Sequence, residues 1–258
     1  MWMIPVMNAA LVVATALVMP LCFGGRWWPW LVATLGVVVS LWFSEGWAAG
    51  LVLLPWVVAL VAQLVRARSL LDVVTVGFGL VSAGALIMSR LELTLFGILE
   101  PIVKLTALHF SYAGVGTLTL ARRLLALRPA ARTQRVTIGL VVAAPVVVAL
   151  GFIARSSVGQ VGGALLMTAG TWLVASLNFT QVRALRSTVA QGLMVISSLS
   201  PWASMMLAIS WAANNYWPQV PALTVVDMVP THGALNAFGF VACALLAWRS
   251  AKAVVVTV

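Results

Sequence analysis

The chain has very few charged residues. Only 8% of its 258 residues are Asp, Glu, Lys or Arg and 5 of them are acidic, whereas 63% of the chain is hydrophobic. A water-soluble protein could not cover its surface with so few polar groups. This shortage excludes an ordinary soluble domain and indicates that lipid surrounds the protein.

Residues that bind metals or form disulfides are also scarce. The chain has 2 cysteines, Cys22 and Cys243, and 2 histidines. Their positions match neither a disulfide framework nor a metal-ligand spacing. Aspartate-rich motifs that hold Mg²⁺ are absent, which argues against metal-assisted ionisation of a diphosphate. We therefore expect no metal and no other cofactor.

Long apolar runs fill the space between the few charges. A membrane-spanning helix needs roughly 20 apolar residues, and the sequence has about nine such runs: 3–23, 27–43, 46–65, 70–88, 101–121, 134–154, 158–182, 188–212 and 227–248. The loops between them are too short for a second domain. The sequence predicts an all-α polytopic membrane protein, one bundle of about eight or nine transmembrane helices that forms a single domain over residues 1–258.

The basic residues predict the orientation. Twelve of the 15 Lys and Arg residues fall in alternate loops: Arg26, Arg66, Arg68, Arg122, Arg123, Arg128, Arg132, Arg135, Arg183, Arg186, Arg249 and Lys252. Positive residues mark cytoplasmic loops, so we expect the N-terminus outside and the C-terminus in the cytoplasm. The basic segment 122–135 lacks interleaved stacking aromatics, and we expect no nucleic-acid partner.

Aromatic residues divide into two groups. Most of the 12 tryptophans lie at the ends of the predicted spans, where indole rings anchor a protein at the membrane surface. Trp172, Trp202 and Trp211 lie inside the seventh and eighth runs instead. They are candidates either for ordinary core packing or for lining a binding site.

The fifth run carries polar residues on one helical face. Taking Glu100 as zero at about 100° per residue, one half of the helix holds Glu100, Lys104, Tyr112, Gly116 and His109. Ionisable groups inside a membrane span are costly and therefore indicate a functional site. The alternative is a Glu100–Lys104 salt bridge at the outer interface, in the favourable i,i+4 order.

The ninth run has a second polar face. His232 and Asn236 lie four residues apart, and Gly233 and Gly239 allow close approach of a neighbouring helix or ligand. Hydrogen bonding between helices is the alternative explanation for His232 and Asn236. Asp227 begins the run and is a candidate for either a functional acid or a helix-capping residue.

The fifth and ninth runs are predicted to cross the membrane in the same direction. Glu100 and Asp227 then both lie at the outer end, with His109 and Asn236 about 13 Å deeper at 1.5 Å per residue. We expect these groups to converge on one site. The other acids have simpler roles: Asp72 is expected in the first turn of a cytoplasmic-side helix, and Glu45 and Glu92 are expected in outer loops.

Two segments resemble a known family. The strings Leu105–Gly114 (LTALHFSYAG) and Thr231–Phe240 (THGALNAFGF) resemble the two signatures of the YndJ-like bacterial membrane proteins. Chains of this kind also resemble the membrane-integral terpene cyclases of drimentine-type indole-sesquiterpenoid pathways. The resemblance implies a multi-pass protein of the bacterial plasma membrane.

The cyclase resemblance implies a chemistry that these residues can perform. Its substrate would be an apolar prenylated small molecule, such as a farnesylated indole, taken from the bilayer. A desolvated carboxylic acid would protonate the chain, aromatic rings would stabilise the cations, and a base would remove the last proton. The implied catalytic residues are Asp227 as the donor, His232 as the group that tunes or reprotonates it, and Glu100 as a second acid or terminal base.

The remaining polar and aromatic residues would bind the substrate. In this hypothesis Lys104 pairs with one of the carboxylates, and His109, Tyr112 and Asn236 line the pocket. Candidate cation-facing rings, of which we expect fewer than half to face inward, are Phe110, Trp172, Phe179, Trp202, Trp211, Phe238 and Phe240.

Two other functions fit the same residues. Intramembrane acids and histidines are equally typical of proton relays, so a proton-coupled YndJ-type transporter is the main alternative. A non-enzymatic membrane subunit is the third. A protein that cyclises a prenyl chain should convert it to an isomer of the same mass, whereas a transporter should leave it unchanged.

Overall fold

The structure is a computed structural model that describes residues 2–94, 96–127 and 132–255 of the chain. Helices make up its regular elements, and no β-strand occurs in those ranges. The described residues form two compact units. The N-terminal unit is residues 4–116, and the C-terminal unit is residues 117–258 together with residues 1–3. The expected single domain stays a prediction.

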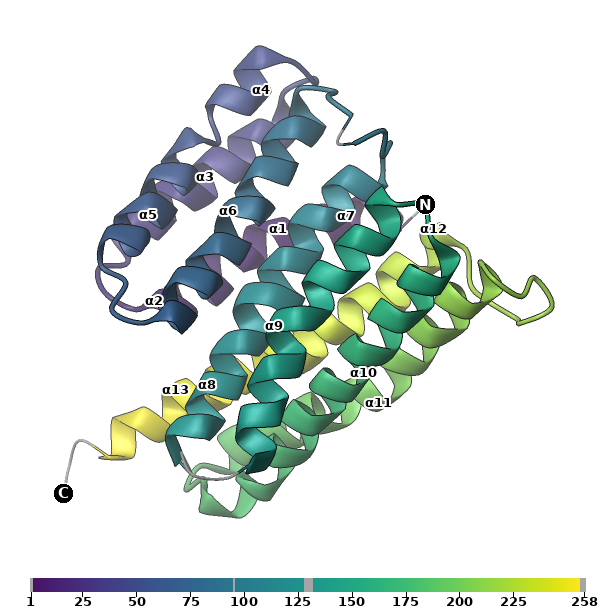
Figure 1. Cartoon of the computed structure of the whole chain (residues 1–258). Helices are drawn as coiled ribbons and strands as arrows, with labels where there is room; N and C mark the ends of the chain where they lie inside the picture. Colours follow the sequence, from purple (N-terminus) through teal and green to yellow (C-terminus); the bar gives the residue numbers. More distant parts are fainter. Residues whose placement is uncertain (1, 95, 128–131, 256–258) are drawn as a thin grey trace. The chain divides into compact units, whose positions relative to one another are not determined.

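The N-terminal unit contains the first helices (Figure 1). Its elements are α1 (Met3–Val13), the π-helical η1 (Ala14–Val18), α2 (Met19–Phe23), α3 (Trp28–Trp42), α4 (Trp47–Leu51), α5 (Leu54–Val65), α6 (Leu70–Arg90), α7 (Ile102–His109) and the π-helical η2 (Phe110–Gly116). Its core includes Leu11, Trp30, Trp56, Leu60 and Leu86, each at most 1% exposed.

The C-terminal unit contains the longest helices. Its elements are α8 (Thr117–Leu127), α9 (Arg132–Ile153), α10 (Ser157–Thr180), the short 3₁₀ helix η3 (Val182–Ala184), α11 (Thr188–Asn214), α12 (Val225–Met228), the π-helical η4 (Val229–Gly233) and η5 (Leu235–Ala242), and α13 (Cys243–Val255). Helices α9, α10 and α11 lie side by side (Figure 1).

Short polar side chains begin several of these helices. Ser156 accepts a hydrogen bond from Gly159, Ser187 from Ala190 and Thr224 from Asp227, each from a backbone amide of the first turn. Such caps satisfy amide groups that a helix leaves unpaired at its start. The capping box of Ser69 and Asp72 begins α6, which confirms the prediction that Asp72 is a first-turn acid.

Seven helical segments are long and apolar enough to cross a membrane: Met3–Phe23, Trp47–Val65, Leu70–Arg90, Arg132–Ile153, Ser157–Ala184, Thr188–Asn214 and Val225–Ser250. They confirm seven of the predicted runs and the class of multi-pass membrane protein. Helix α3, with 15 residues, is shorter than a usual span. The continuous helical stretch 102–127 is outside this set, because polar residues interrupt its apolar sequence. A total of eight or nine spans and the orientation of the termini stay predictions.

Glycines allow α9 and α10 to pack closely. A Cβ atom added at Gly163 would lie 2.8–2.9 Å from Val148 atoms, two of them backbone, and one added at Gly151 would lie 2.7 Å from backbone atoms of residues 159 and 160. Small residues are the usual means by which helices in lipid reach van der Waals contact. The neighbouring Gly162 has no atom within 4 Å of such a Cβ.

This contrast gives a prediction for stability. We expect Gly163→Ala to destabilise the protein by about 1–3 kcal/mol, because the methyl group overlaps the α9 backbone. Gly162→Ala adds the same methyl group into open space and should be neutral, or more stable by up to about 1 kcal/mol through helix propensity. Thermal unfolding in detergent measures both variants, and equal midpoints for the two would contradict the close packing.

Candidate functional site

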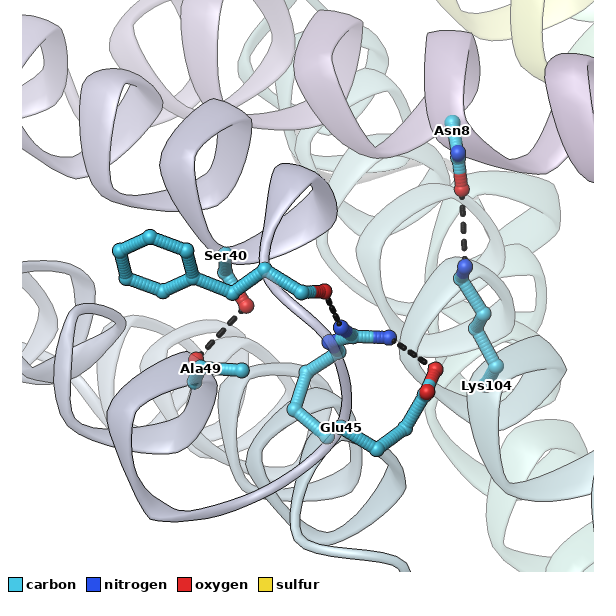
Figure 2. Close-up of polar contacts among 7 residues, drawn as sticks. Asn8, Ser40, Glu45, Ala49 and Lys104 are labelled. Carbon is cyan, nitrogen blue, oxygen red and sulfur yellow. Dashed lines mark hydrogen bonds and ion pairs between the residues drawn. The ribbon is translucent and has the colours of Figure 1, made fainter.

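A group of charged and polar residues gathers at one end of the N-terminal unit (Figure 2). We call Asn8, Glu45, Arg90, Glu100 and Lys104 the charged cluster. The Lys104 ammonium on α7 donates a hydrogen bond to Asn8 Oδ1 on α1 at 2.8 Å. Glu45, Arg90 and Glu100 are the charged groups close enough to act on Lys104 electrostatically. The cluster therefore combines two acids and two bases.

Arg90 is the buried member of this cluster. Its Nη1 lies 2.6 Å from Glu45 Oε1, and its Nη2 donates to the Phe43 carbonyl at 2.6 Å. The side chain is 6% exposed, whereas that of Glu45 is 51% exposed. The Arg90 Nε is buried with no hydrogen-bond partner among the described residues. The Arg90 guanidinium thus joins the end of α6 to the loop after α3 by hydrogen bonds.

The structure corrects the predicted start of the fifth run. Helix α7 begins at Ile102 with Pro101 as its N-cap, so Glu100 precedes the helix and is exposed. Within the described part of the chain, Lys104 binds Asn8 and makes no ion pair with Glu100. The i,i+4 salt bridge, the alternative interpretation of these two residues, does not form between them in the structure, because Glu100 is not on the helix.

A change of helical winding also alters the predicted polar face. The helix passes from α to π at Phe110, and π-helices close i→i+5 hydrogen bonds, so each residue turns less than in an α-helix. Tyr112 is buried there and donates its hydroxyl to the Ala10 carbonyl at 2.7 Å. Ser82 contacts the Ala107 carbonyl at 2.6 Å and Ser111 Oγ at 2.7 Å. These hydroxyls support the backbone at the α-to-π junction.

His109 and Phe110 lie at this junction as well. The His109 ring is partly buried and meets the Phe110 ring edge-on, with centroids 6.3 Å apart. Phe110 is 6% exposed and packs against Phe78, with ring centroids 5.6 Å apart. Phe110 is therefore a core residue of the N-terminal unit.

The C-terminal unit holds His232 in a defined geometry. His232 Nδ1 lies 2.7 Å from the Ser204 carbonyl oxygen on α11. A carbonyl only accepts hydrogen bonds, so Nδ1 carries the proton in the neutral ring and Nε2 keeps a lone pair. Nε2 has no hydrogen-bond partner among the described residues. Asn236 donates to the His232 carbonyl at 2.9 Å, which fixes the amide beside the ring.

A stacked pair of tryptophans joins α10 to the same part of α11. Trp172 donates from Nε1 to the Pro201 carbonyl at 3.1 Å, three residues before Ser204. Its ring stacks on Trp202 with centroids 4.5 Å apart and an interplanar angle of 20°. Trp202 is 45% exposed, so one indole face is open to the surroundings.

The other candidate rings have different positions. Trp211 stacks on Phe152, with centroids 6.0 Å apart. Phe238 is partly buried, Phe240 is 1% exposed, and Phe179 is 53% exposed. The Phe240 carbonyl accepts a hydrogen bond from Ser197 at 2.8 Å. Phe240 therefore serves the packing of η5 on α11.

Asp227 occupies the third position of α12. It is exposed, and its Oδ2 accepts a hydrogen bond from the Thr224 hydroxyl at 2.7 Å. Its backbone amide donates back to Thr224 Oγ1 at 3.3 Å. Asp227 is thus a first-turn acid hydrogen-bonded to the N-cap residue Thr224, the structural role that the sequence left open beside the functional one.

Sequence reasoning missed Asn8 and the Glu45–Arg90 pair. Asn8 gave no signal, because nothing in the sequence places it beside Lys104. Arg90 did give one: it is one of the three Lys and Arg residues outside the loops predicted to be cytoplasmic, and positive residues are disfavoured in outer loops. Such a residue needs a partner, and Glu45 in another outer loop was an available acid.

The described residues contain no group of three His, Cys, Asp or Glu side chains placed to bind a metal ion. The YndJ-like protein family matches residues 2–240, nearly the whole chain. The chain belongs to the YndJ-like family. No curated protein and no solved structure matches it. Both sequence segments that suggested this family lie within the matched region of the YndJ-like chain.

The Glu45–Arg90 pair predicts an acid-sensitive fold. Hydrogen bonds from its own backbone amide and from Arg90 hold the pKa of the Glu45 carboxyl below its usual value of 4.5. Because the folded pKa is depressed, its stabilising contribution is complete above about pH 4.5 and is lost as pH falls through the folded pKa. We expect Glu45→Gln to lower the melting temperature at pH 7 and to have less effect at pH 3.

Melting curves from pH 7 to pH 3 in a detergent that stays uncharged measure this effect. The matched control is Glu92→Gln, since Glu92 is also exposed near Arg90. A constant difference between Glu45→Gln and wild type over the whole pH range would contradict the electrostatic role of the pair.

Proposed function

We propose that this YndJ-like protein is a membrane-integral terpene cyclase that protonates and cyclises a farnesyl-type chain carried by an indole or similar acceptor. The observation that supports it is the Trp172–Trp202 stack within one turn of the carbonyl that holds His232. Aromatic faces stabilise cations through their quadrupole. A neutral imidazole with an available Nε2 is a suitable proton-exchange partner for an acid.

The proposed reaction conserves mass. A proton adds to the less substituted carbon of the last double bond and leaves a tertiary cation. Electron pairs of the remaining double bonds then form the ring carbon–carbon bonds in turn. The base removes a proton next to the last cation, so the product is an isomer of the substrate. This route needs no metal ion, because protonation rather than loss of diphosphate starts it.

Asp227 is the proposed proton donor, with His232 as its proton-exchange partner. A carboxyl group can donate a proton near neutral pH only in an apolar, water-poor setting that keeps it protonated. Asp227 is exposed in the free protein, so the proposal requires the bound prenyl chain to cover it. Asn236 keeps its proposed role in substrate binding beside His232. Glu100, Lys104, His109 and Tyr112 lie in the N-terminal unit, and their roles as second acid or terminal base and in substrate binding stay predictions from the sequence.

The distribution of arginines supports the location. We place the protein in the bacterial plasma membrane with its N-terminus outside and its C-terminus in the cytoplasm. Asp227 and Glu100 then both lie near the outer surface. An apolar substrate would enter this region laterally from the bilayer.

We expect Asp227→Asn to reduce cyclisation by at least about 100-fold, the usual contribution of a general acid. Purified protein in detergent is incubated with a farnesylated indole, and liquid chromatography with mass detection finds a product of unchanged mass and new retention time. Asp72→Asn is a matched control, because Asp72 is also the third residue of its helix, α6, and follows a hydroxyl N-cap residue. Equal activity of Asp227→Asn and wild type would overturn the assignment of the donor.

A proton-coupled transporter is the second candidate. It is favoured by π-helical stretches at candidate residues of both units: Tyr112 lies on η2, and His232 and Asn236 lie on η4 and η5. Such stretches often mark functional sites in helices. Pro201 interrupts the hydrogen bonding of α11 beside His232. The charged cluster, which cyclisation leaves largely unused, would take part in a proton pathway.

The transport candidate predicts a proton flux that depends on His232. Proteoliposomes containing a pH-sensitive dye are exposed to a panel of small solutes, and coupled uptake acidifies the interior. We expect His232→Gln to abolish this signal while Thr231→Val keeps it, because the Thr231 hydroxyl binds only backbone carbonyls of its own helix. A flux that persists in His232→Gln, or no flux with any solute beside active cyclisation, would reject transport.

A further inference from the structure

The loop between α3 and α4 forms a small pocket that is open to the surroundings. Residues 43–48 line a space of about 280 Å³. The pocket takes no part in the reaction proposed above. It lies where α3 ends in exposed aromatic residues and α4 begins, and it contains a single carboxylate, that of Glu45.

The ion pair beneath this pocket presents only its negative end. Arg90 is 6% exposed and Glu45 is 51% exposed, so the cation is covered and the anion is accessible. The guanidinium is also bound to the Phe43 carbonyl, which keeps it under the loop. One Glu45 oxygen contacts Arg90, and a carboxylate has further lone pairs to accept other donors.

Two aromatic residues belong to the same pocket lining as this carboxylate. Trp47 is 76% exposed and Phe43 is 46% exposed. Indole and phenyl faces attract cations, and an ammonium group is the ligand for which a carboxylate together with aromatic rings is suited. An anion would be repelled by Glu45, and a purely apolar group would desolvate the carboxylate oxygen that Arg90 does not contact.

We propose that the loop 43–48 binds the ammonium group of a zwitterionic lipid headgroup of the phosphatidylethanolamine type. The source is a lipid rather than a dissolved amine because the pocket adjoins apolar surface. Trp42, at the end of α3, is 87% exposed, and exposed tryptophans at the end of an apolar helix mark the headgroup level of a bilayer. A bound lipid places its ammonium group at this level and its chains beside α3.

Native mass spectrometry of the full chain in detergent tests this site. Wild type is titrated with phosphatidylethanolamine and, separately, with phosphatidylglycerol of the same chain length, well below the melting temperature of every variant. We expect Glu45→Gln to weaken binding of phosphatidylethanolamine about tenfold, the scale of one charge-assisted contact. Binding of phosphatidylglycerol, which has no ammonium group, should not change.

Two more variants separate recognition from stability. Trp47→Leu removes a ring but leaves the Glu45–Arg90 pair, and it should also weaken phosphatidylethanolamine binding several-fold. Glu92→Gln removes an exposed acid outside the pocket and should bind like wild type. Unchanged phosphatidylethanolamine affinity in both Glu45→Gln and Trp47→Leu would overturn the proposal.

A competition experiment distinguishes the two sources of an ammonium group. Free ethanolamine is added to the complex of wild type with phosphatidylethanolamine. We expect it to displace the lipid only at concentrations at least about 100-fold higher, because the lipid chains add apolar contact. Displacement at equal concentration would overturn the assignment to a lipid and identify a site for a soluble amine.

Discussion

The absence of water inside a bilayer is the constraint on which the other features depend. A backbone carbonyl in hydrocarbon needs a donor from the protein itself. In this chain many of the polar side chains within the apolar helices meet that need: Ser82, Tyr112, Ser197 and His232 each contact a backbone carbonyl of another helical segment. Their first role is to join helices where the winding or packing changes.

The fold was largely predictable, because a continuous run of apolar residues is a strong and local sign of a membrane-spanning helix. Seven of the predicted runs correspond to apolar helices within about two residues at most ends. The prediction was weakest at 27–43 and 101–121, where the first helix is short and the second is polar and changes winding. The change from α-helix to π-helix at Phe110 shifts the angular position of every later residue around the helix axis. No rule based on sequence predicts that shift.

The candidate site was less predictable, because its contacts join residues far apart in the chain. The resemblance of two segments identified the family correctly, and periodicity singled out His232 and Asn236, which do contact each other. Neither could show that Glu100 precedes its helix or that Lys104 meets Asn8 across 96 residues. Glu45 was predicted in a loop, but its role in the charged cluster depends on its ion pair with Arg90, which is 45 residues away.

The buried position of Arg90 also has a consequence for biogenesis. In the proposed orientation this guanidinium must pass through the hydrocarbon to reach the outer side, where a charge at the bilayer centre costs about 2.5–3.5 kcal/mol on translocon insertion scales. Synthesis proceeds from the N-terminus, so Glu45 is already outside when the α6 segment emerges. The segment from α3 to α4 thus places the Glu45 carboxylate on the outer side before Arg90 arrives. Correct insertion of α6 therefore depends on the earlier insertion of that segment.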